Sequence, residues 1–188
     1  MNTWQFRCVD FLLALIGLIL ASPLLLIAVV VGFFDTGSPL FIQQRVGLNQ
    51  RPFILIKFRT MRVGTASVAT HEASHHAITR WGTWLRKSKI DELPQLINVL
   101  KGEMSLVGPR PCLPSQQQLI DERQLRGVFS VLPGITGLAQ VNAIDMSTPV
   151  LLAETDQQMI ASFCGQAYCR YLLLTVIGRG AGDRVLPG

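Results

Sequence analysis

An uninterrupted apolar run near the start of the chain places the strongest constraint on its fold. Residues 11–34, between Asp10 and Asp35, carry no charged side chain and are nearly all apolar. Because about 20 such residues span the hydrocarbon core of a bilayer, the run predicts a membrane helix. A cleaved signal peptide would have a shorter apolar core, a more basic start and a small-residue cleavage site, so the run favours a permanent membrane segment.

The dipeptide Ser22-Pro23 lies in the middle of this run. Proline removes a backbone donor and clashes with the preceding turn, so we expect the helix to bend there, with the serine hydroxyl bonding a freed carbonyl. Two topologies follow: a spanning helix with a mild kink, which is the default for such a run, or a re-entrant helix-break-helix that enters and leaves on one face. Basic residues on both sides, Arg7 before the run and five from Arg45 to Arg62 after it, give no inside–outside asymmetry.

Composition separates this chain from an ordinary soluble domain. Only 15% of its 188 residues are charged, against about 25% in typical soluble proteins. The formal net charge of +5 favours anionic partners such as lipid headgroups, phosphorylated substrates or nucleic acid. Because the basic residues are dispersed and no aromatic platform accompanies them, we do not expect nucleic acid to be the partner. The four cysteines show no paired spacing, and we expect them to be reduced thiols.

The rest of the chain predicts short elements of mixed type. Two β-prone runs around a Gly/Asn linker predict a hairpin, and apolar side chains at helical spacing predict helices. In chain order we expect strands over 40–44 and 52–58, helices over 79–88 and 91–102, a rigid loop over 107–111, a helix over 114–126 and a tight turn over 133–137. The expected fold class is therefore α+β, a compact body that lies against the membrane.

Asp91-Glu92 is the first candidate for chemistry. The pair follows the basic stretch 86–89 and is expected to open a helix, so the helix N-terminus and the nearby cations both favour an ionised Asp91. Adjacent helical residues point about 100° apart, which favours divided roles over a shared proton. An ionised aspartate beside cations suits attack on phosphorus or Mg²⁺ ligation. The alternative without chemistry is that Asp91 and Glu92 are a charge pair that only stabilises the start of a helix.

Four cations can complete such a site. Guanidinium and ammonium groups near a carboxylate nucleophile can hold a diphosphate and its developing charge. Each cation taken alone is more often a solvated surface charge. The one between two prolines is the exception, because the prolines fix its backbone. The four are Lys57, Arg59, Arg86 and, in the proline-framed loop, Arg110.

The segment His71-Glu72-Ala73-Ser74-His75 matches the HExxH pattern of zinc proteases. The small polar run before it is a poor buried helix, and His76 is the only further histidine, so a third ligand would have to be a carboxylate. Short motifs match by chance, and we expect adventitious metal binding here rather than zinc catalysis.

Several longer motifs follow one another along the chain. They are Ser22-Pro23, Gln44-Arg45-Val46-Gly47, Lys57-Phe58-Arg59-Thr60-Met61, Leu85-Arg86-Lys87, Asp91-Glu92-Leu93-Pro94-Gln95-Leu96, the block from Asn98 to Pro111, and the block from Pro133 to Asn142. Their order and spacing, over roughly residues 5–142, resemble those of the monotopic phosphoglycosyl transferases, or bacterial sugar transferases. The central block is too long and specific for a chance match.

The resemblance implies a fold and a reaction. It implies a re-entrant helix, residues 1–36, broken at Ser22-Pro23, and a cytoplasmic interfacial catalytic domain, residues 37–188, on the inner membrane of a bacterium. Asp91 is implied as the nucleophile that attacks the sugar-bearing phosphorus of a UDP-sugar, expels UMP and forms a covalent phosphosugar intermediate. Polyprenyl (undecaprenyl) phosphate then takes up the phosphosugar, in the first membrane step of glycoconjugate or polysaccharide synthesis.

The resemblance also assigns residues by motif position. Asp91 and Glu92 are implied as catalytic, and Asp91 as a ligand of Mg²⁺. Two arginines are implied as phosphate-binding residues, and three other side chains as further contributors to the pocket. These five substrate-binding residues are Arg86, Arg110, Lys57, Arg59 and Gln140.

Departures from the family's pattern gather in the C-terminal part of the chain. Ala143 stands where glycine is usual, Met159 stands where a tyrosine is expected after Asp156, and Tyr168 replaces an acidic residue. The segment 71–80 is also unusual. These changes leave the dyad and the arginines intact but put the sugar pocket and the C-terminal packing in question. The main alternative is therefore a membrane-anchored scaffold of the same fold without activity; a homodimer is a further expectation.

Overall fold

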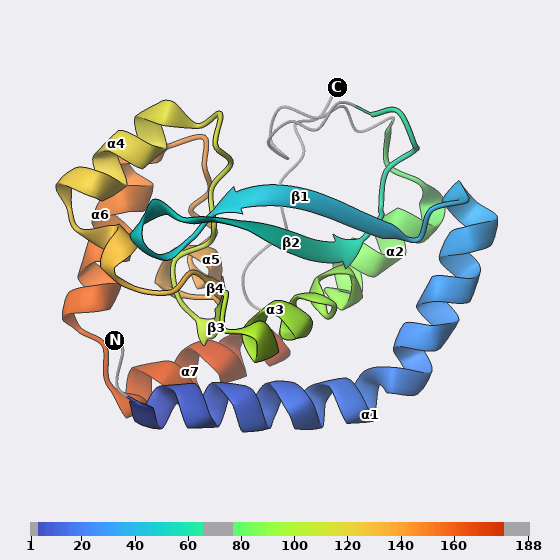
Figure 1. Ribbon diagram of the computed structural model, residues 1–188, viewed down its shortest axis with the longest axis horizontal. Coiled ribbons are helices and arrows are strands. Elements are labelled where there is room, and N and C mark those ends of the chain that lie inside the picture. Colours follow the sequence, from blue (N-terminus) through green and yellow to red (C-terminus); the bar gives the residue numbers. More distant parts are fainter. Residues whose placement is uncertain (1–3, 66–76, 179–188) are drawn as a thin grey trace.

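The computed structural model describes residues 4–65 and 77–178, so the His71-Glu72-Ala73-Ser74-His75 segment lies outside the described residues. It confirms a mixed fold of helices and short strands (Figure 1). In chain order, with η for 3-10 helices, the elements are α1 (Trp4–Thr36), β1 (Leu40–Val46), η1 (Leu48–Gln50), β2 (Pro52–Phe58), α2 (Arg80–Ser88), η4 (Ile90–Glu92), α3 (Gln95–Lys101), β3 (Ser105–Val107), α4 (Gln117–Leu125), η5 (Val128–Ser130), β4 (Gly134–Thr136), α5 (Leu138–Val141), α6 (Pro149–Ala161) and α7 (Gly165–Val176).

The apolar run forms α1, one long helix with a bend. From Phe6 to Thr36 the helix is long and apolar enough to cross a membrane, and most of its large side chains are exposed. The ribbon of α1 turns sharply partway along its length (Figure 1), and Pro23 lies inside this helix. The Ser22 hydroxyl donates to the Ile19 carbonyl at 2.7 Å, in the turn where the proline disturbs the helical bonding. The bend expected at Ser22-Pro23 is present, and the helix continues through it.

Two charged side chains attach the first turns of α1 to the body. Arg7 donates to carbonyls at the C-terminal end of α3 and just beyond it, at 3.3 and 3.0 Å. The Asp10 carboxylate, which is 1% exposed, accepts from the Leu106 amide at 3.0 Å and from the Tyr168 hydroxyl at 2.8 Å. Asp10 therefore joins α1 to β3 and α7. Tyr168, which departs from the family pattern, has a defined partner.

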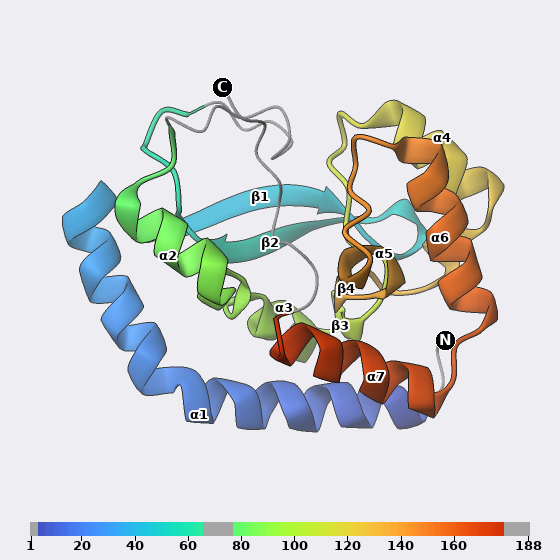
Figure 2. The same cartoon turned by 180° about the vertical axis from the view of Figure 1, so that it is seen from behind.

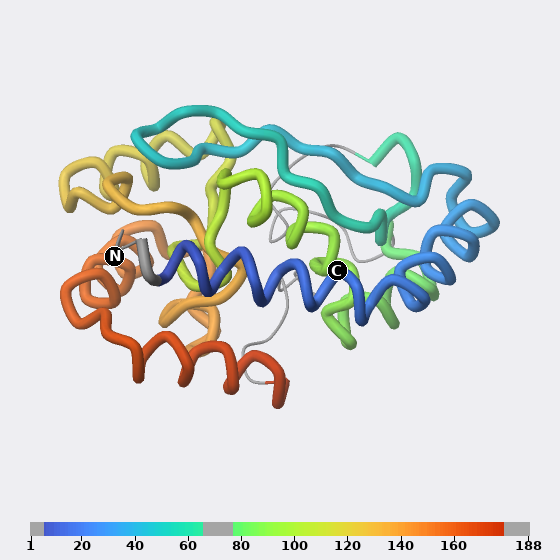
Figure 3. The backbone as a smooth tube through the Cα atoms, turned by 60° about the horizontal axis from the view of Figure 1, so that its bottom comes forward, coloured from blue at the N-terminus to red at the C-terminus, as the bar shows by residue number. Residues whose placement is uncertain are grey.

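The far end of α1 is attached as well. The Thr79 hydroxyl donates to the Asp35 carboxylate at 2.7 Å and accepts from the Gly82 amide at 2.8 Å, as the N-cap of α2. Both arms of the bent helix thus contact the same folded body, as the tube through the Cα atoms shows (Figure 3).

β1 and β2 form the expected antiparallel hairpin, paired from Leu40 with Phe58 to Val46 with Pro52. Side chains alternate between the two faces of a strand, so one face of the hairpin gathers every second residue. That face carries polar side chains that are nevertheless buried. They are Gln43, Arg45 and Lys57.

Asn98 of α3 covers the outer edge of β2. Its Oδ1 accepts from the Ile56 amide at 3.2 Å, and its Nδ2 donates to the Ile54 carbonyl at 2.6 Å and to Glu103 at 2.7 Å. A side-chain amide thus satisfies backbone groups that a third strand would otherwise pair. α3 also packs on α1, so it lies between the hairpin and the membrane-helix candidate (Figures 1 and 2).

The helix expected from Asp91 to Gly102 begins later than predicted. α3 starts at Gln95, after Pro94, and ends with Gly102 in the left-handed region at φ 83°. Asp91 and Glu92 lie instead in the separate 3-10 turn η4. Lys89 before them adopts φ 57°, a left-handed conformation at the C-terminal end of α2. The dyad therefore sits on a turn between two helices, and the prediction that it opens a helix was wrong.

A parallel pair of three-residue strands was not expected. β3 pairs with β4, so the segment predicted as a tight turn at 133–137 contains a strand. The two backbones approach so closely that a Cβ on Gly134 would lie 2.0 Å from the Gly108 amide nitrogen. Glycine is therefore required at this crossing, where the strand pair continues into the loop that contains Arg110.

The remaining helices close the core. The predicted helices over 79–88 and 114–126 are confirmed as α2 and α4, and α6, which was not predicted, packs against α4. Their contact contains an ion pair between Arg123 and Asp156, with side chains 2% and 1% exposed. All four cysteines are free, as expected.

Candidate active site

The dyad occupies a partly sheltered turn. Asp91 is 8% exposed, and η4 packs against both α2 and β2. The left-handed Lys89 on one side and Pro94 on the other set the course of the backbone. The sequence therefore places two adjacent carboxylates in a 3-10 turn between the end of α2 and the start of α3.

Glu92 meets the proline-framed loop. Arg110 Nη2 donates to Glu92 Oε1 at 2.7 Å, with the two side chains 25% and 17% exposed. A charge-assisted bond of this length fixes the position of the guanidinium relative to the dyad. Two motifs separated in sequence are thus brought into direct contact, and the phosphate-binding role of Arg110 stays a prediction.

Arg86 supplies a second guanidinium from the last turn of α2. Its Nε donates to the Thr60 hydroxyl at 2.9 Å. Its Nη1 is buried and has no hydrogen-bond partner among the described residues. A buried donor without a partner is uncommon, and an anionic ligand oxygen is one natural partner for it.

The other three predicted pocket residues lie in different settings. Lys57 is buried, with Nζ 5.5 Å from the centre of the Phe41 ring. Arg59 donates to backbone carbonyls at the link between α1 and β1, at 2.9 and 3.2 Å. Gln140 Nε2 donates to the Gly108 carbonyl at 3.3 Å, and its buried Oε1 has no partner among the described residues. Gln140 thus contacts the Arg110 loop, whereas the hydrogen bonds of Arg59 tie the end of β2 to the start of β1.

Lys89 belongs to the same charge cluster, although sequence reasoning did not single it out. Burial lowers the pKa of its ammonium group; nearby Glu92 raises it and Arg110 lowers it further. The signal was present in the sequence, because Lys89 ends the basic stretch directly before the dyad. The site therefore gathers cations from α2, the η4 turn and the Arg110 loop around two carboxylates.

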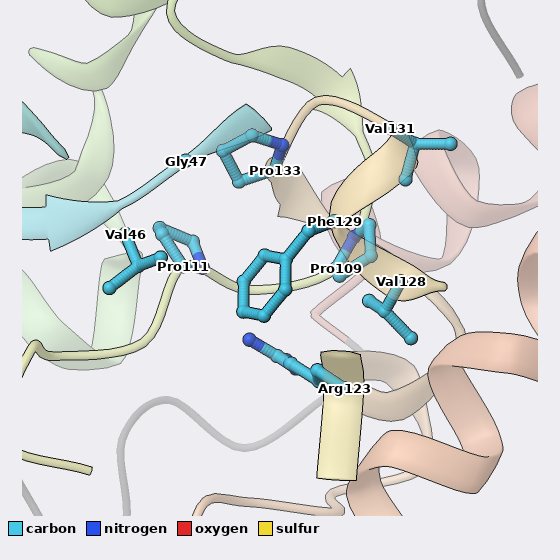
Figure 4. A pocket seen from close by; sticks show the side chains of 9 residues that line it. All are labelled: Val46, Gly47, Pro109, Pro111, Arg123, Val128, Phe129, Val131 and Pro133. Carbon is cyan, nitrogen blue, oxygen red and sulfur yellow. The ribbon is translucent and has the colours of Figure 1, made fainter. Parts of the chain in front are cut away.

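A small hollow lies behind the Arg110 loop. It is partly open to solvent and is lined by Val46, Gly47, Pro109, Pro111, Arg123, Val128, Phe129, Val131 and Pro133. The Phe129 ring and the Arg123 side chain lie beside the two loop prolines (Figure 4). Neither carboxylate of the dyad lines the hollow, so it supports the loop rather than contributing to the reacting centre.

The carboxylates fit Mg²⁺ better than a self-contained metal centre. Within residues 4–65 and 77–178, no group of three or more His, Cys, Asp or Glu side chains could hold a metal. Mg²⁺ is commonly bound by one or two carboxylates together with substrate phosphates and water. Asp91 and Glu92 supply donors of that kind and number.

Comparison with known proteins gives consistent matches. The family model described as bacterial sugar transferase matches residues 1–178. An uncharacterized sugar transferase of Bacillus subtilis, EpsL, is 44% identical over 137 residues, 72% of this chain and 67% of that protein. A UDP-glucose:undecaprenyl-phosphate glucose-1-phosphate transferase of Xanthomonas campestris is 44% identical over 151 residues, 76% of this chain and 31% of that protein.

A relative that uses another sugar matches to a similar extent. A UDP-N-acetylgalactosamine-undecaprenyl-phosphate N-acetylgalactosaminephosphotransferase of Aeromonas hydrophila is 41% identical over 143 residues, 72% of this chain and 33% of that protein. The chain thus spans about a third of the length of the two named transferases. Because the family match covers nearly all of it, including the dyad and the Arg110 loop, this chain belongs to the bacterial sugar transferase family.

Proposed function

We propose that this chain transfers a sugar 1-phosphate from a UDP-sugar to a polyprenyl phosphate such as undecaprenyl phosphate and releases UMP. The observation that carries the proposal is the Glu92–Arg110 ion pair at 2.7 Å, beside the sheltered Asp91. The names of the relatives, which pair UDP-sugars with undecaprenyl phosphate, support the same reaction.

The proposed first step forms a bond between an Asp91 carboxylate oxygen and the phosphorus that carries the sugar. The bond between that phosphorus and the bridging oxygen of UMP breaks, and UMP leaves with the electron pair. In the second step an oxygen of the polyprenyl phosphate attacks the same phosphorus. The Asp91 carboxylate is then released unchanged, which completes the cycle.

The cations in this scheme stabilise charge rather than transfer protons. Phosphoryl transfer depends mainly on positioning and on neutralising charge on the phosphate oxygens. The buried Nη1 of Arg86 and the guanidinium of Arg110 are the donors proposed for those oxygens. Glu92 orients Arg110 through their ion pair. Lys57, Arg59 and Gln140 remain predicted contributors to substrate binding.

Asp91, with Glu92 beside it, is the residue proposed to hold Mg²⁺. When bound, the ion supplies charge neutralisation for the diphosphate. The exposed fraction of Asp91, 8%, suits both tasks, because it limits water access to a covalent phosphosugar while one edge stays reachable.

The contacts of α1 favour the re-entrant topology. Asp10 near its start bonds Leu106, and Asp35 near its end bonds Thr79, so both ends are attached to one folded body. A straight crossing would put these two attachment points on opposite sides of a bilayer. We therefore propose that α1 enters and leaves on the cytoplasmic face of the inner membrane, where a UDP-sugar and a lipid acceptor can meet.

The test is UMP release by the purified chain in detergent or nanodiscs, with Mg²⁺, undecaprenyl phosphate and a panel of UDP-sugars. Asp91→Asn is expected to abolish release. Asp121→Asn, which removes an exposed carboxylate on α4, is the matched control and is expected to retain it. Trapping radiolabelled phosphosugar on the wild-type chain, and not on Asp91→Asn, identifies the intermediate.

The rival is an inactive membrane-anchored scaffold of the same fold. A folded, lipid-reconstituted chain that releases no UMP from any sugar would favour that reading. UMP release that persists in Asp91→Asn would instead keep the transferase and refute the aspartyl intermediate.

A further inference from the structure

The loop that carries Arg110 has an unusual hydrogen-bond balance. Pro109 and Pro111 have no backbone N–H, so the loop has few donors of its own. Yet five consecutive carbonyls, from Gly108 to Cys112, each accept a hydrogen bond from another element. The donors, in order, are Gln140 Nε2 at 3.3 Å, the Gly134 amide at 2.8 Å, Arg123 Nη1 at 2.8 Å, Arg45 Nη1 at 3.0 Å and the Val46 amide at 3.0 Å.

Two of these donors are buried arginine side chains that bond adjacent carbonyls. Arg123, 1% exposed, donates to the carbonyl of Arg110 itself, and Arg45, 7% exposed, donates to that of Pro111. They come from α4 and β1, which lie far apart in sequence. In Figure 4 the Arg123 side chain reaches toward the loop from below Phe129.

Arg123 is itself held in place. Its Nε and Nη2 both donate to one oxygen of Asp156, at 3.0 and 2.7 Å, which leaves Nη1 to bond the Arg110 carbonyl. A continuous path of hydrogen bonds therefore runs from Asp156 on α6 to Arg123, to Arg110 and to Glu92. Each member fixes the next through a charge-assisted bond.

We propose that Arg123, held by Asp156, and Arg45 are positioning residues for the Arg110 clamp, an inference that rests on the proposed function. The carbonyl oxygen of Arg110 is two covalent bonds from the Cα of the same residue. If that oxygen loses its hydrogen bond from Arg123, the peptide group can rotate. The rotation moves the Arg110 side chain, which is proposed to bind a phosphate. A displacement of about 1 Å at a positioning group can cost on the order of 100-fold in rate.

The test replaces both members of the buried Arg123–Asp156 ion pair, so that no unpaired charge stays buried. Arg123→Met with Asp156→Leu removes both ions together, which often leaves stability unchanged or higher, whereas removing one partner alone strands a buried charge. We expect kcat/KM for the UDP-sugar to fall about 10- to 100-fold while Tm stays close to wild type. The matched control is Arg126→Met, one turn further along the chain, which loses contacts to Glu122 and Glu154 but none to the loop. It should leave kcat/KM within a factor of about two.

A double-mutant cycle separates positioning from general support. If Arg123 acts through Arg110, then in an Arg110→Lys background the double replacement should cost less than about threefold, because the clamp is already impaired. Full additivity, or an unchanged kcat/KM in the Arg110 wild-type background, would overturn the proposal. If the chain with Arg123→Met and Asp156→Leu does not fold, the milder substitution Arg123→Lys takes its place in the double-mutant cycle with Arg110→Lys.

A readout independent of turnover distinguishes this proposal from the proposed function. Backbone amide exchange over residues 108–113 should accelerate in the Arg123→Met, Asp156→Leu variant and not in Arg126→Met. A wild-type chain without UMP release would refute the transferase, yet faster exchange would still support the positioning role. Unchanged exchange in an active chain would refute the positioning role alone.

Discussion

Tyr168→Phe tests how firmly the start of α1 is attached to the body. The ring of Tyr168 packs on Phe6 and Phe163, with ring centres 5.4 and 6.2 Å away, and phenylalanine preserves both contacts. Only the hydroxyl that donates to Asp10 at 2.8 Å is lost. The Asp10 carboxylate then keeps its bond from the Leu106 amide but loses its second neutral donor.

The expected magnitude follows from the burial of this bond. Tyr168 is 3% exposed and Asp10 1%, so water does not replace the lost donor. A hydrogen bond to a carboxylate contributes about 1.5–3 kcal/mol. At about 2–4 °C per kcal/mol for a chain of this size, Tm should fall by about 3–12 °C. Tyr171→Phe, one turn further along α7, is the control, because no described residue bonds its hydroxyl and Tm should barely move.

The pH dependence of the same pair gives a second check. Burial, and then the bond to Asp10 and its charge, raise the pKa of Tyr168 above the unfolded value of 10.0. The folded chain therefore keeps this proton after the unfolded chain has lost it, and the stabilisation is complete below pH 10 and declines above it. The stability gap between wild type and Tyr168→Phe should narrow by up to about 1.4 kcal/mol per pH unit above pH 10.

Thermal unfolding in detergent, followed by circular dichroism from neutral pH to pH 11, measures both effects. Equal Tm values for Tyr168→Phe and Tyr171→Phe would refute the attachment of α1 through Asp10. A gap that did not narrow above pH 10 would show that the Tyr168 proton is not held more tightly in the folded chain.

Two further substitutions test the supports of the dyad. Gly82→Ala would place a Cβ 2.0 Å from the Thr60 carbonyl oxygen and should cost about 1–3 kcal/mol, whereas Gly165→Ala, which meets open space, should cost nothing measurable by the same thermal assay. Asn98→Leu strands two backbone groups of β2 and should lower the free energy of unfolding by about 2–5 kcal/mol, measured by urea titration. Destabilisation of under about 1 kcal/mol would show that water reaches that edge.

The elements with strong local signals were predictable. The β-prone runs around a Gly/Asn linker formed the hairpin, and the helix predicted over 79–88 formed α2. The turn that carries the dyad could not be predicted from the sequence. Its backbone depends on Lys89 in a left-handed conformation, which lysine rarely adopts and which no local sequence pattern indicates. The strands β3 and β4, three residues each, are too short to show a period and form only through their mutual pairing.

The candidate site divides along the same line. Residue type and motif position point to Asp91, Glu92, Arg86 and Arg110 as candidates, whose roles stay predictions. Arg123 was overlooked because it stands in a helix that reads as polar and solvent-facing, and its burial depends on α6, an element that was not predicted. The candidate ligand-binding side chains belong to recognisable sequence motifs. The role of Arg123 in holding the loop backbone becomes visible only from its contacts in the folded chain.

The bonds of Asp10 also impose an order on biosynthesis. Its two hydrogen-bond donors, Leu106 and Tyr168, lie 96 and 158 residues downstream, whereas Arg7, whose guanidinium lies 3.8 Å from the carboxylate, is made before it. An unpaired carboxylate is costly in hydrocarbon. Until α7 has been synthesised, Asp10 has Arg7 beside it but lacks the Tyr168 hydroxyl, so the fully bonded state of this carboxylate awaits the folding of the last described helix.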